Sequence, residues 1–590
     1  MSKGKSEGHG TDEPTGGKRG LTRRDLLKAG AVAGAASVVA GPATMAAAVV
    51  QEPAPPVGPP DIILTRGKIH TLDATNRVAS SVALKDGKII DIDGRGRGGP
   101  DTQVIDLRGR TVIPGLIESH THFVSLANRV GHHVADVELS RSNEEFVAYL
   151  AARRPEVPEG EFITAMGGWN PNHWPEGRLP TLAELDAAIP DRPVFVMQGT
   201  TGPSRVNSLG KAFFETVTSP LAGPVAVSAE GVIAAGSPST TALYHLRVRH
   251  TLETKARSAV YAQKYSAKVG ITTVLDQTLP PSPGPLMPNQ ALFSLDHFRM
   301  YDGWLKAHAA GDNYIRLQIN FLHSQGYNAA LGDLANQLPE LRERLRNQFP
   351  FFGNNWVRTG GIGEWAASFA APTNANGHAV WRESQRLVAQ ARWRNENAQA
   401  AAANVGHVLD AYEACDAEFG IKDLRWGIQH ADAATPEQLQ RAKALNVGIS
   451  TSGFRWQTLA AASGNPVGPF FPQMVESGVK LAMHEDGVHI APHNAWFALH
   501  YAVTGLDRQG NLSNPGQQIS RLDALRLYTT GAAWYLNREN ELGSLEVGKW
   551  ADLLVLDRDY FTVSEADMRR TLPVLTIVDG KIVHDTGAVG

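Results

Sequence analysis

The sequence predicts a mixed α/β protein in which both ends of the mature chain build a small β domain around a larger central region. Short β patterns with glycine turns fill residues 61–92, and similar patterns return at 551–557 and 575–583. Between them, apolar strand patterns alternate with longer helical patterns, which is typical of parallel βα units. A third observation is the apolar run at 111–117, which leads into His120 and His122. This strand is the first in the series of alternating strands and helices.

Length and composition set the outer limits. The chain has 590 residues, with 42% hydrophobic and 19% charged residues, enough for one large soluble domain and a smaller one. The formal net charge is −3 and no basic tract dominates, so a nucleic-acid partner is not expected. The single cysteine, Cys415, excludes an intramolecular disulfide and a zinc site built on several cysteines. Any metal must therefore be held by histidines and carboxylates.

The first 48 residues are typical of an export signal. Arg23 and Arg24 precede an apolar stretch at 29–40, and small residues at 46–48 offer a cleavage site. The pair resembles a twin-arginine (Tat) signal, which predicts export to the periplasm or beyond by the Tat machinery. A short anchor or a chance arginine pair is the alternative. The apolar stretch is too short for a stable membrane span, and residues 49–60 are predicted as a linker.

Local patterns predict the elements of the central region in chain order. Helical patterns occur at 143–153, 252–269, 380–391 and 436–445. Strand patterns occur at 194–197, 271–275, 315–319 and 447–450. If these strands are parallel, the side chains at their carboxyl ends gather at one edge, where catalytic groups of a (β/α)8 barrel lie.

His120 and His122 are the strongest chemical feature. Alternate side chains of a strand point to the same face, so the two imidazoles share one side. Two imidazoles at the end of a buried strand suit two positions on one metal ion. The alternative is an exposed pair without a function.

Three segments carry a family resemblance. Residues 112–122 read Val-Ile-Pro-Gly-Leu-Ile-Glu-Ser-His-Thr-His, and residues 168–181 and 543–557 hold further family motifs. With them the chain resembles the metal-dependent amidohydrolase superfamily, in its amidohydrolase family 3 branch of exoenzyme-like proteins. The resemblance implies a (β/α)8 TIM-like barrel at 113–540 and a β-sandwich formed by 61–112 and 541–590. It also implies a small-molecule substrate, and it leaves a homodimer open.

The resemblance implies roles for several residues. His120 and His122 would be first-strand ligands. Asp486 ends the last-strand segment and would bind the metal and take a proton from the attacking water; the alternative is a turn-capping aspartate before Gly487. His430 would be a sixth-strand ligand or an oxyanion stabiliser, against a purely structural histidine. His484, one strand step before Asp486, either lines the pocket or packs inside.

Two departures from the family pattern bear on the metal. Glu364 stands where many relatives carry a carboxylated lysine, and we expect it to be a ligand; the alternative is an acid that contacts the substrate or another ligand. The fifth-strand histidine, expected between Trp393 and Leu409, is missing: His407 is the only histidine there, and it falls in a stretch at 405–415 that is predicted as a helix. Glu396 is only a weak substitute. We therefore expect one zinc, with iron or manganese as alternatives, and regard a second metal as doubtful.

The combined prediction is an exported metal-dependent amidohydrolase that cleaves a C–N bond of an amide or cyclic amide, but not a peptide bond. Asp486 would act as general base on a metal-activated water, and His430 would steady the oxyanion. One alternative is a deaminase, isomerase or esterase on the same scaffold, because function resides in the site. The other is a binding protein that has lost catalysis.

Overall fold

The computed structural model describes residues 56–94, 98–199, 201–277, 300–458, 465–488 and 490–590. These residues belong to one compact unit that begins at Pro55. The export signal predicted at 1–48 and the first part of the predicted linker lie outside the described residues. Within the described ranges, no helix is both long and apolar enough to span a bilayer.

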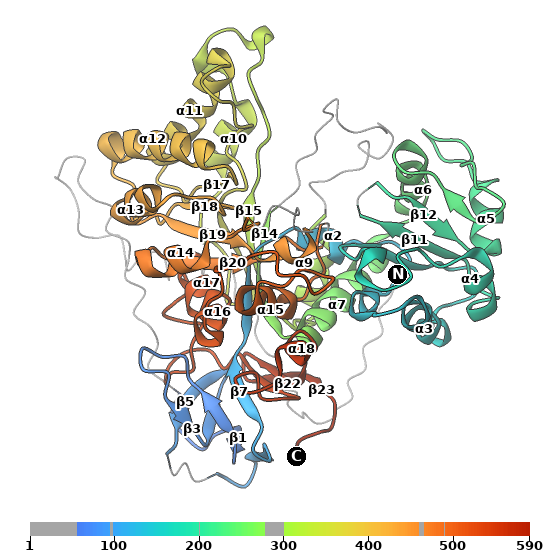
Figure 1. The fold of residues 1–590 in the computed structure, drawn as a ribbon, viewed down its shortest axis with the longest axis horizontal. Helices are drawn as coiled ribbons and strands as arrows, with labels where there is room; N and C mark the ends of the chain where they lie inside the picture. Colours follow the sequence, from blue (N-terminus) through green and yellow to red (C-terminus); the bar gives the residue numbers. More distant parts are fainter. Residues whose placement is uncertain (1–55, 95–97, 200, 278–299, 459–464, 489) are drawn as a thin grey trace, which may run out of the picture. The chain divides into compact units, whose positions relative to one another are not determined.

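Two four-stranded parallel sheets form the centre of the fold (Figure 1). The first has the order β16-β15-β14-β8, with bounds Val357–Ile362, Arg316–Phe321, Ile271–Gln277 and Leu116–Thr121. The second has the order β17-β18-β19-β20, with bounds Glu396–Ala398, Gly427–Gln429, Gly448–Ser452 and Leu481–His484. A parallel bridge between Ile362 and Asn395 joins β16 to β17. At the other side Ser119 of β8 donates to the Met483 carbonyl of β20 over 3.0 Å.

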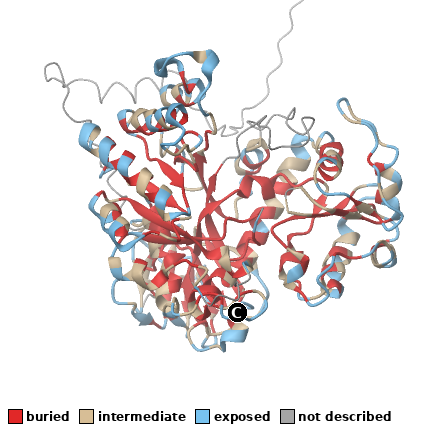
Figure 2. Cartoon of the chain, turned by 45° about the horizontal axis from the view of Figure 1, so that its top comes forward, coloured by how far each residue is buried: buried red, intermediate tan, exposed pale blue. Residues whose placement is uncertain are grey.

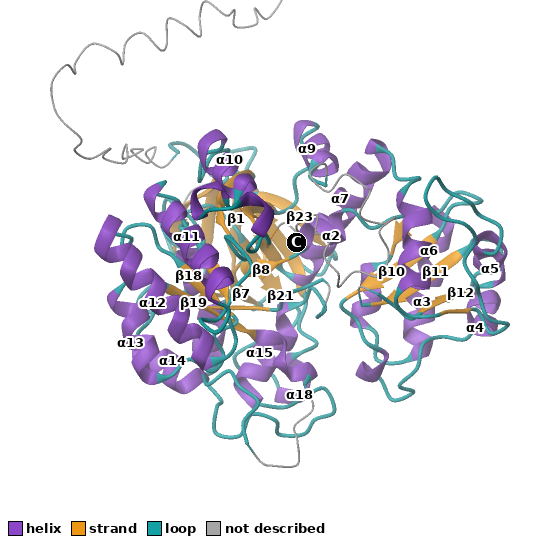
Figure 3. Ribbon diagram, turned by 90° about the horizontal axis from the view of Figure 1, so that it is seen from above, coloured by secondary structure: helices purple, strands orange, loops and turns teal. Residues whose placement is uncertain are grey.

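Helices lie outside these strands, and the strands between them are buried (Figures 2 and 3). Their bounds are α2 Phe123–Ala127, α7 Leu252–Val269, α9 Asp302–Ala309, α10 Pro339–Asn347, α11 Ala375–Gln390, α12 Ala402–Phe419, α13 Pro436–Ala444, α14 Phe471–Ser477, α15 Ala495–Thr504, α16 Arg521–Leu527, α17 Thr530–Tyr535 and α18 Glu565–Met568. Local signals set the ends: α7 starts at a capping box formed by Thr251 and Thr254 and stops at Gly270, whose φ of +92° is left-handed.

The mixed α/β class is confirmed, and so are most local elements. Helix α7 has the predicted bounds, and α13 ends one residue before the predicted end. Helix α11 was expected to begin at 380 but begins at Ala375, because Asn374 caps it by accepting from Gly377 N. Strands β14, β15 and β19 lie where strands were predicted.

A separate sheet lies inside the region predicted as the barrel. Its order is β13-β12-β11-β10-β9, with bounds Val232–Ile233, Ser204–Val206, Val194–Gln198, Ile163–Gly167 and His132–His133. Helices α3 Asn143–Arg153, α4 Leu182–Ala188, α5 Ser208–Phe214 and α6 Ser237–Arg247 accompany it. We call residues 132–247 the insert. The strand predicted at 194–197 exists as β11, but its placement in the parallel series was wrong, since it pairs with β10 and β12.

Both ends of the described chain meet in two further sheets. One has the order β5-β4-β1-β6, with bounds Lys88–Ile92, Val82–Lys85, Ile62–Thr65 and Gln103–Asp106. The other has the order β23-β22-β21-β7-β2-β3, with bounds Lys581–Asp585, Pro573–Val578, Leu553–Leu556, Thr111–Pro114, Lys68–His70 and Val78–Ala79. Leu64, Leu84 and Leu553 share one apolar cluster between them. Strand β7 leads through Gly115 alone into β8.

Candidate metal centre

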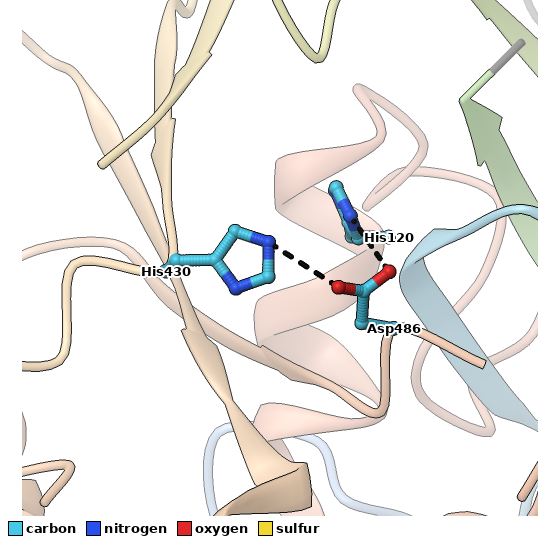
Figure 4. A group of neighbouring side chains, drawn as sticks. All are labelled: His120, His430 and Asp486. Carbon is cyan, nitrogen blue, oxygen red and sulfur yellow. Dashed lines mark ion pairs between the residues drawn. The ribbon is translucent and has the colours of Figure 1, made fainter. Parts of the chain in front are cut away.

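Five predicted residues lie at the carboxyl ends of four parallel strands. His120 is in β8 and His122 follows that strand; Glu364 follows β16, His430 follows β18 and Asp486 follows β20. Because parallel strands end at one edge, residues distant in sequence meet there. Figure 4 shows His120, His430 and Asp486 pointing toward one another. We call the five residues the metal centre.

The Asp486 carboxylate lies among three imidazoles. Its Oδ1 is 3.2 Å from His120 Nε2 and 3.5 Å from His122 Nε2. Its Oδ2 is 3.6 Å from His430 Nε2. Glu364 approaches from the other sheet, with Oε2 3.6 Å from His122 Nε2 and Oε1 3.9 Å from His430 Nε2. The residues therefore present two carboxylates and three ring nitrogens to a common space.

The partner of Nδ1 in each imidazole decides whether Nε2, the nitrogen that faces that space, carries a hydrogen or a lone pair. His120 Nδ1 lies 2.6 Å from Gln429 Oε1, and His122 Nδ1 lies 2.9 Å from the Gln277 carbonyl oxygen. Both partners only accept, so both Nδ1 atoms carry the hydrogen and both Nε2 atoms present a lone pair. His430 Nδ1 lies 2.9 Å from Ser452 Oγ. A hydroxyl donates or accepts, so His430 is free to take either tautomer.

Burial controls the protonation of the metal centre. It raises the pKa of the Glu364 and Asp486 carboxyls to about 7 and lowers the pKa of the three imidazoles. Neutral imidazoles are the form that binds a metal. Among the described residues, His120 Nε2 and Asp486 Oδ1 have no hydrogen-bond partner although both are buried. A divalent cation would compensate such atoms, and the donor types suit zinc.

Two residues of the metal centre have an unusual backbone conformation. His430 and Asp486 have φ angles of 58° and 52°, in the left-handed region that costs a non-glycine residue about 1–3 kcal/mol. In each case the chain leaves a parallel strand and turns its side chain toward the centre. Such positions are enriched at functional sites.

The position of the missing fifth-strand histidine is filled by a buried charge network. Glu396 begins β17 and is fully buried. Its Oε1 forms an ion pair with Arg394, and its Oε2 accepts from Gln429 and, over 3.2 Å, from Gln277. Both carboxylate oxygens are therefore engaged with other side chains, which argues against Glu396 as a metal ligand.

Two further histidines lie near the same edge. The His484 ring centre is 4.7 Å from that of His120 and 4.6 Å from that of His430, so it packs against two residues of the metal centre. His323 is buried beyond β15, and burial lowers its pKa to about 3. Neither belongs to a group of described residues with metal-ligand spacing.

The residues that orient the imidazoles were not predicted. Gln277 ends β14 and Ser452 ends β19, and neither residue type at a strand end is a recognisable metal signal. Gln429 directly precedes His430 and contacts both His120 and Glu396. A position at the carboxyl end of a predicted strand was the one sequence signal that could have identified Gln277, Gln429 and Ser452.

Comparisons with known proteins agree with this geometry. A family model described as the amidohydrolase family matches residues 103–584. The chain is 25% identical to protein LONG AFTER FAR-RED 3 of Arabidopsis thaliana, over 90% of this chain and 93% of that protein. It is 23% identical to the N-substituted formamide deformylase of Arthrobacter pascens, over 89% of this chain and 98% of that protein.

Solved structures are similar in fold. A metal-dependent hydrolase from Pyrococcus horikoshii superposes with a TM-score of 0.52 at 18% identity, over 86% of this chain and 99% of that chain. An atrazine chlorohydrolase from Arthrobacter aurescens, solved with zinc, superposes with a TM-score of 0.50 at 16% identity, over 89% of this chain and 95% of that chain.

Proposed function

The chain belongs to the amidohydrolase family, and we propose that it is an exported metal-dependent hydrolase of a C–N bond in a small amide or cyclic amide, and not of a peptide bond. The observation that carries the proposal is the convergence of three imidazoles and two carboxylates at one edge of the parallel strands. The full-length relative named as a formamide deformylase supports the bond type.

The proposal includes the architecture. The two parallel sheets are the two halves of one closed (β/α)8 barrel, joined at the Ile362–Asn395 bridge and where β20 packs on β8. The two terminal sheets with their shared apolar cluster form the β-sandwich. In a barrel of this kind the reaction takes place at the carboxyl edge of the strands, where the metal centre lies.

We assign one divalent metal, with zinc as the preferred ion, to His120, His122, Glu364 and Asp486. His430 lies at the edge of this group of ligands. When bound, such a metal polarises a carbonyl group and lowers the pKa of water. A second metal would require a further ligand at the position of Glu396. A single metal is favoured because Arg394 already neutralises the charge of Glu396. A second cation there would face the Arg394 guanidinium.

Asp486 and His430 perform the proton chemistry. The Asp486 carboxylate lies 3.2 Å from His120 and 3.6 Å from His430 at the centre of the site, a position from which it takes a proton from water and returns it to the leaving nitrogen. His430 can carry its hydrogen on Nε2 when Ser452 donates to Nδ1, so that Nε2–H donates to the developing oxyanion. His120 and His122 cannot, because their Nδ1 partners only accept.

The test is a substrate panel with two matched proteins. Zinc-loaded protein and its Asp486→Asn variant are assayed on N-acyl amino acids, lactams, cyclic imides, esters and aminated heterocycles, and metal content is measured for both. We expect the wild type to cleave an amide or cyclic amide, and the variant to retain metal without turnover. Activity on esters alone, or deamination alone, would contradict the proposal that the substrate is an amide or cyclic amide. Unchanged kinetics of the variant would show that Asp486 is not the general base.

Export by the Tat route is a separate part of the proposal. Its support is the sequence alone: Arg23 and Arg24 before an apolar stretch, and a chain whose one cysteine requires no oxidative folding. Replacing both arginines by lysine should leave the protein inside the cell while the wild type is exported. Equal export of both proteins would argue against this route.

A further inference from the structure

A cavity of about 690 Å³ lies apart from the metal centre. Its walls come from the insert, from the turn after β19, from α15 and from the segment that contains α18. A volume of this size suits a small organic ligand. None of the five residues of the metal centre is among the residues that line it in the described chain. We call it the arginine pocket.

Five arginines line it, namely Arg141, Arg508, Arg558, Arg569 and Arg570. Three of them form an ion pair with a nearby carboxylate. Arg141 lies 2.6 Å from Glu145, Arg558 lies 2.6 Å from Asp557, and Arg570 lies 3.6 Å from Asp567. These pairs compensate their own charges. The remaining two arginines therefore set the charge of the pocket.

Arg508 and Arg569 have no carboxylate partner among the described residues. The Arg508 side chain donates to the Gln457 carbonyl through Nη1, while its buried Nε has no hydrogen-bond partner there. Arg569 is partly buried, and burial followed by the charge of Arg570 lowers its pKa. Two guanidinium groups that line a cavity and form no ion pair with a carboxylate of the described chain favour an anion.

The acid in the wall does not cancel this charge. Glu138 lines the pocket and is buried. Burial raises the pKa of its carboxyl to about 7, so a large fraction of it is neutral at neutral pH. Its Oε2 also accepts from Tyr265 and from the His493 backbone N–H. The carboxyl is thus held by the protein and leaves Arg508 and Arg569 to a ligand.

Aromatic rings form the other part of the lining. Trp456 stacks on Phe497 with ring centres 4.9 Å apart, and the ring centre of His173 also lies 4.9 Å from that of Trp456. Trp174 and Tyr149 also line the pocket. Rings fixed by one another give a rigid apolar wall, which favours a flat ring in the ligand.

We propose that the arginine pocket is a second binding site, separate from the metal centre, for a small organic anion that carries an aromatic ring. Guanidinium groups at Arg508 and Arg569 bind the anionic group, and the wall of Trp456 and Phe497 contacts the ring. The site lies where the insert meets the layer around the parallel strands, so a ligand there contacts both parts of the chain.

The test uses the full metal-loaded chain and 2-naphthoate as the probe, with 2-naphthalenemethanol as its neutral counterpart. Calorimetry measures affinity, and tryptophan fluorescence reports contact with Trp174 and Trp456. We expect 2-naphthoate to bind and to change the fluorescence, and the neutral alcohol to bind at least about tenfold more weakly. Equal affinities for the two probes would overturn the anion assignment.

Variants then locate the bound probe. Arg569→Gln should weaken 2-naphthoate about tenfold or more while the affinity for the alcohol is unchanged, and Arg569→Lys should recover part of the loss. The control is Arg386→Gln, an arginine of α11 that pairs with Glu418 away from the pocket; it should leave the affinity unchanged. Binding should survive removal of the metal. Binding that is lost with the metal, or that is insensitive to Arg569→Gln, would overturn the proposal.

Discussion

The three imidazoles of the metal centre differ in what contacts their far nitrogens. His120 and His122 are each fixed by an atom that only accepts, whereas His430 faces a hydroxyl. The first two can therefore act only as lone-pair donors toward the centre, and the third can also donate a hydrogen. Under the proposed function, this division supplies metal ligands and a proton donor from one residue type.

Gln429→Leu tests the division at one side chain. The change removes the acceptor of His120 Nδ1 and one contact of Glu396, so the His120 ring loses its fixed orientation. We expect the metal affinity to fall about 10- to 100-fold, measured by competition with a chelator. Gln440→Leu, at an exposed position of α13, is the control and should bind metal like the wild type. Equal affinities in all three proteins would contradict the orienting role.

Glu138 gives a pH-dependent stability. Its folded pKa is about 7 against an ordinary value of 4.5, because burial favours the neutral form. The folded chain keeps this proton between those values while the unfolded chain loses it, so stability falls as pH rises through this window. Relative to Glu138→Gln, the free energy of unfolding of the wild type should decrease by up to about 3 kcal/mol from pH 4.5 to pH 7. Denaturant titrations of both proteins measure this difference, and a constant difference would contradict it.

The sequence predicts the residues that converge in the metal centre better than the residues that orient them. His120 and His122 stand two residues apart on one strand, and Asp486 precedes a glycine in a recognisable segment. Gln277 and Ser452 come from other strands and contribute a carbonyl and a hydroxyl. Such contacts depend on how strands pair, which no local spacing encodes.

Elements with local signals were predicted well. The capping box at Thr251 and the left-handed Gly270 define α7 within its own segment. The separate sheet of the insert was not predicted, although its helix α3 and strand β11 were, because its strands and helices alternate as those around the parallel sheets do. Only pairing partners distinguish β11 from β14, and pairing is a long-range property.

One close contact links the insert to the metal centre. A Cβ atom added at Gly168, just after β10, would lie 1.6 Å from the Ala491 carbonyl oxygen, in the segment that follows Asp486. Gly168→Ala should therefore displace that segment, lower the free energy of unfolding by about 1–3 kcal/mol and weaken metal binding. Denaturant titration and metal titration measure the two effects.

The matched control for that change is Gly223→Ala. A Cβ atom there meets nothing within 4 Å among the described atoms, so both stability and metal binding should stay at wild-type values. If Gly168→Ala behaves like Gly223→Ala, the insert does not constrain the metal centre through this contact.

At the scale of the whole molecule, a buried ion pair ties the parallel strands to the terminal β domain. Arg316 of β15 donates to both carboxylate oxygens of Asp552, over 2.7 and 2.8 Å, and both side chains are buried. Asp552 directly precedes β21. The last part of the described chain is thus held to a strand from its middle.

Arg316→Met should leave the Asp552 carboxylate buried without its partner. We expect a loss of about 3–5 kcal/mol in the free energy of unfolding, measured by denaturant titration. The double variant Arg316→Met with Asp552→Asn removes the unpaired charge as well and should recover part of the loss. A single variant as stable as the wild type would show that the two parts are held together by other contacts.

The number of metal ions held by the metal centre is the most direct measurement. Elemental analysis of protein purified without chelators, and again after reconstitution with zinc, gives the stoichiometry, and His120→Ala together with His122→Ala gives the background. We expect one equivalent per chain that is lost in the double variant. Two equivalents, or none even after reconstitution, would contradict a single-metal centre built on His120, His122, Glu364 and Asp486.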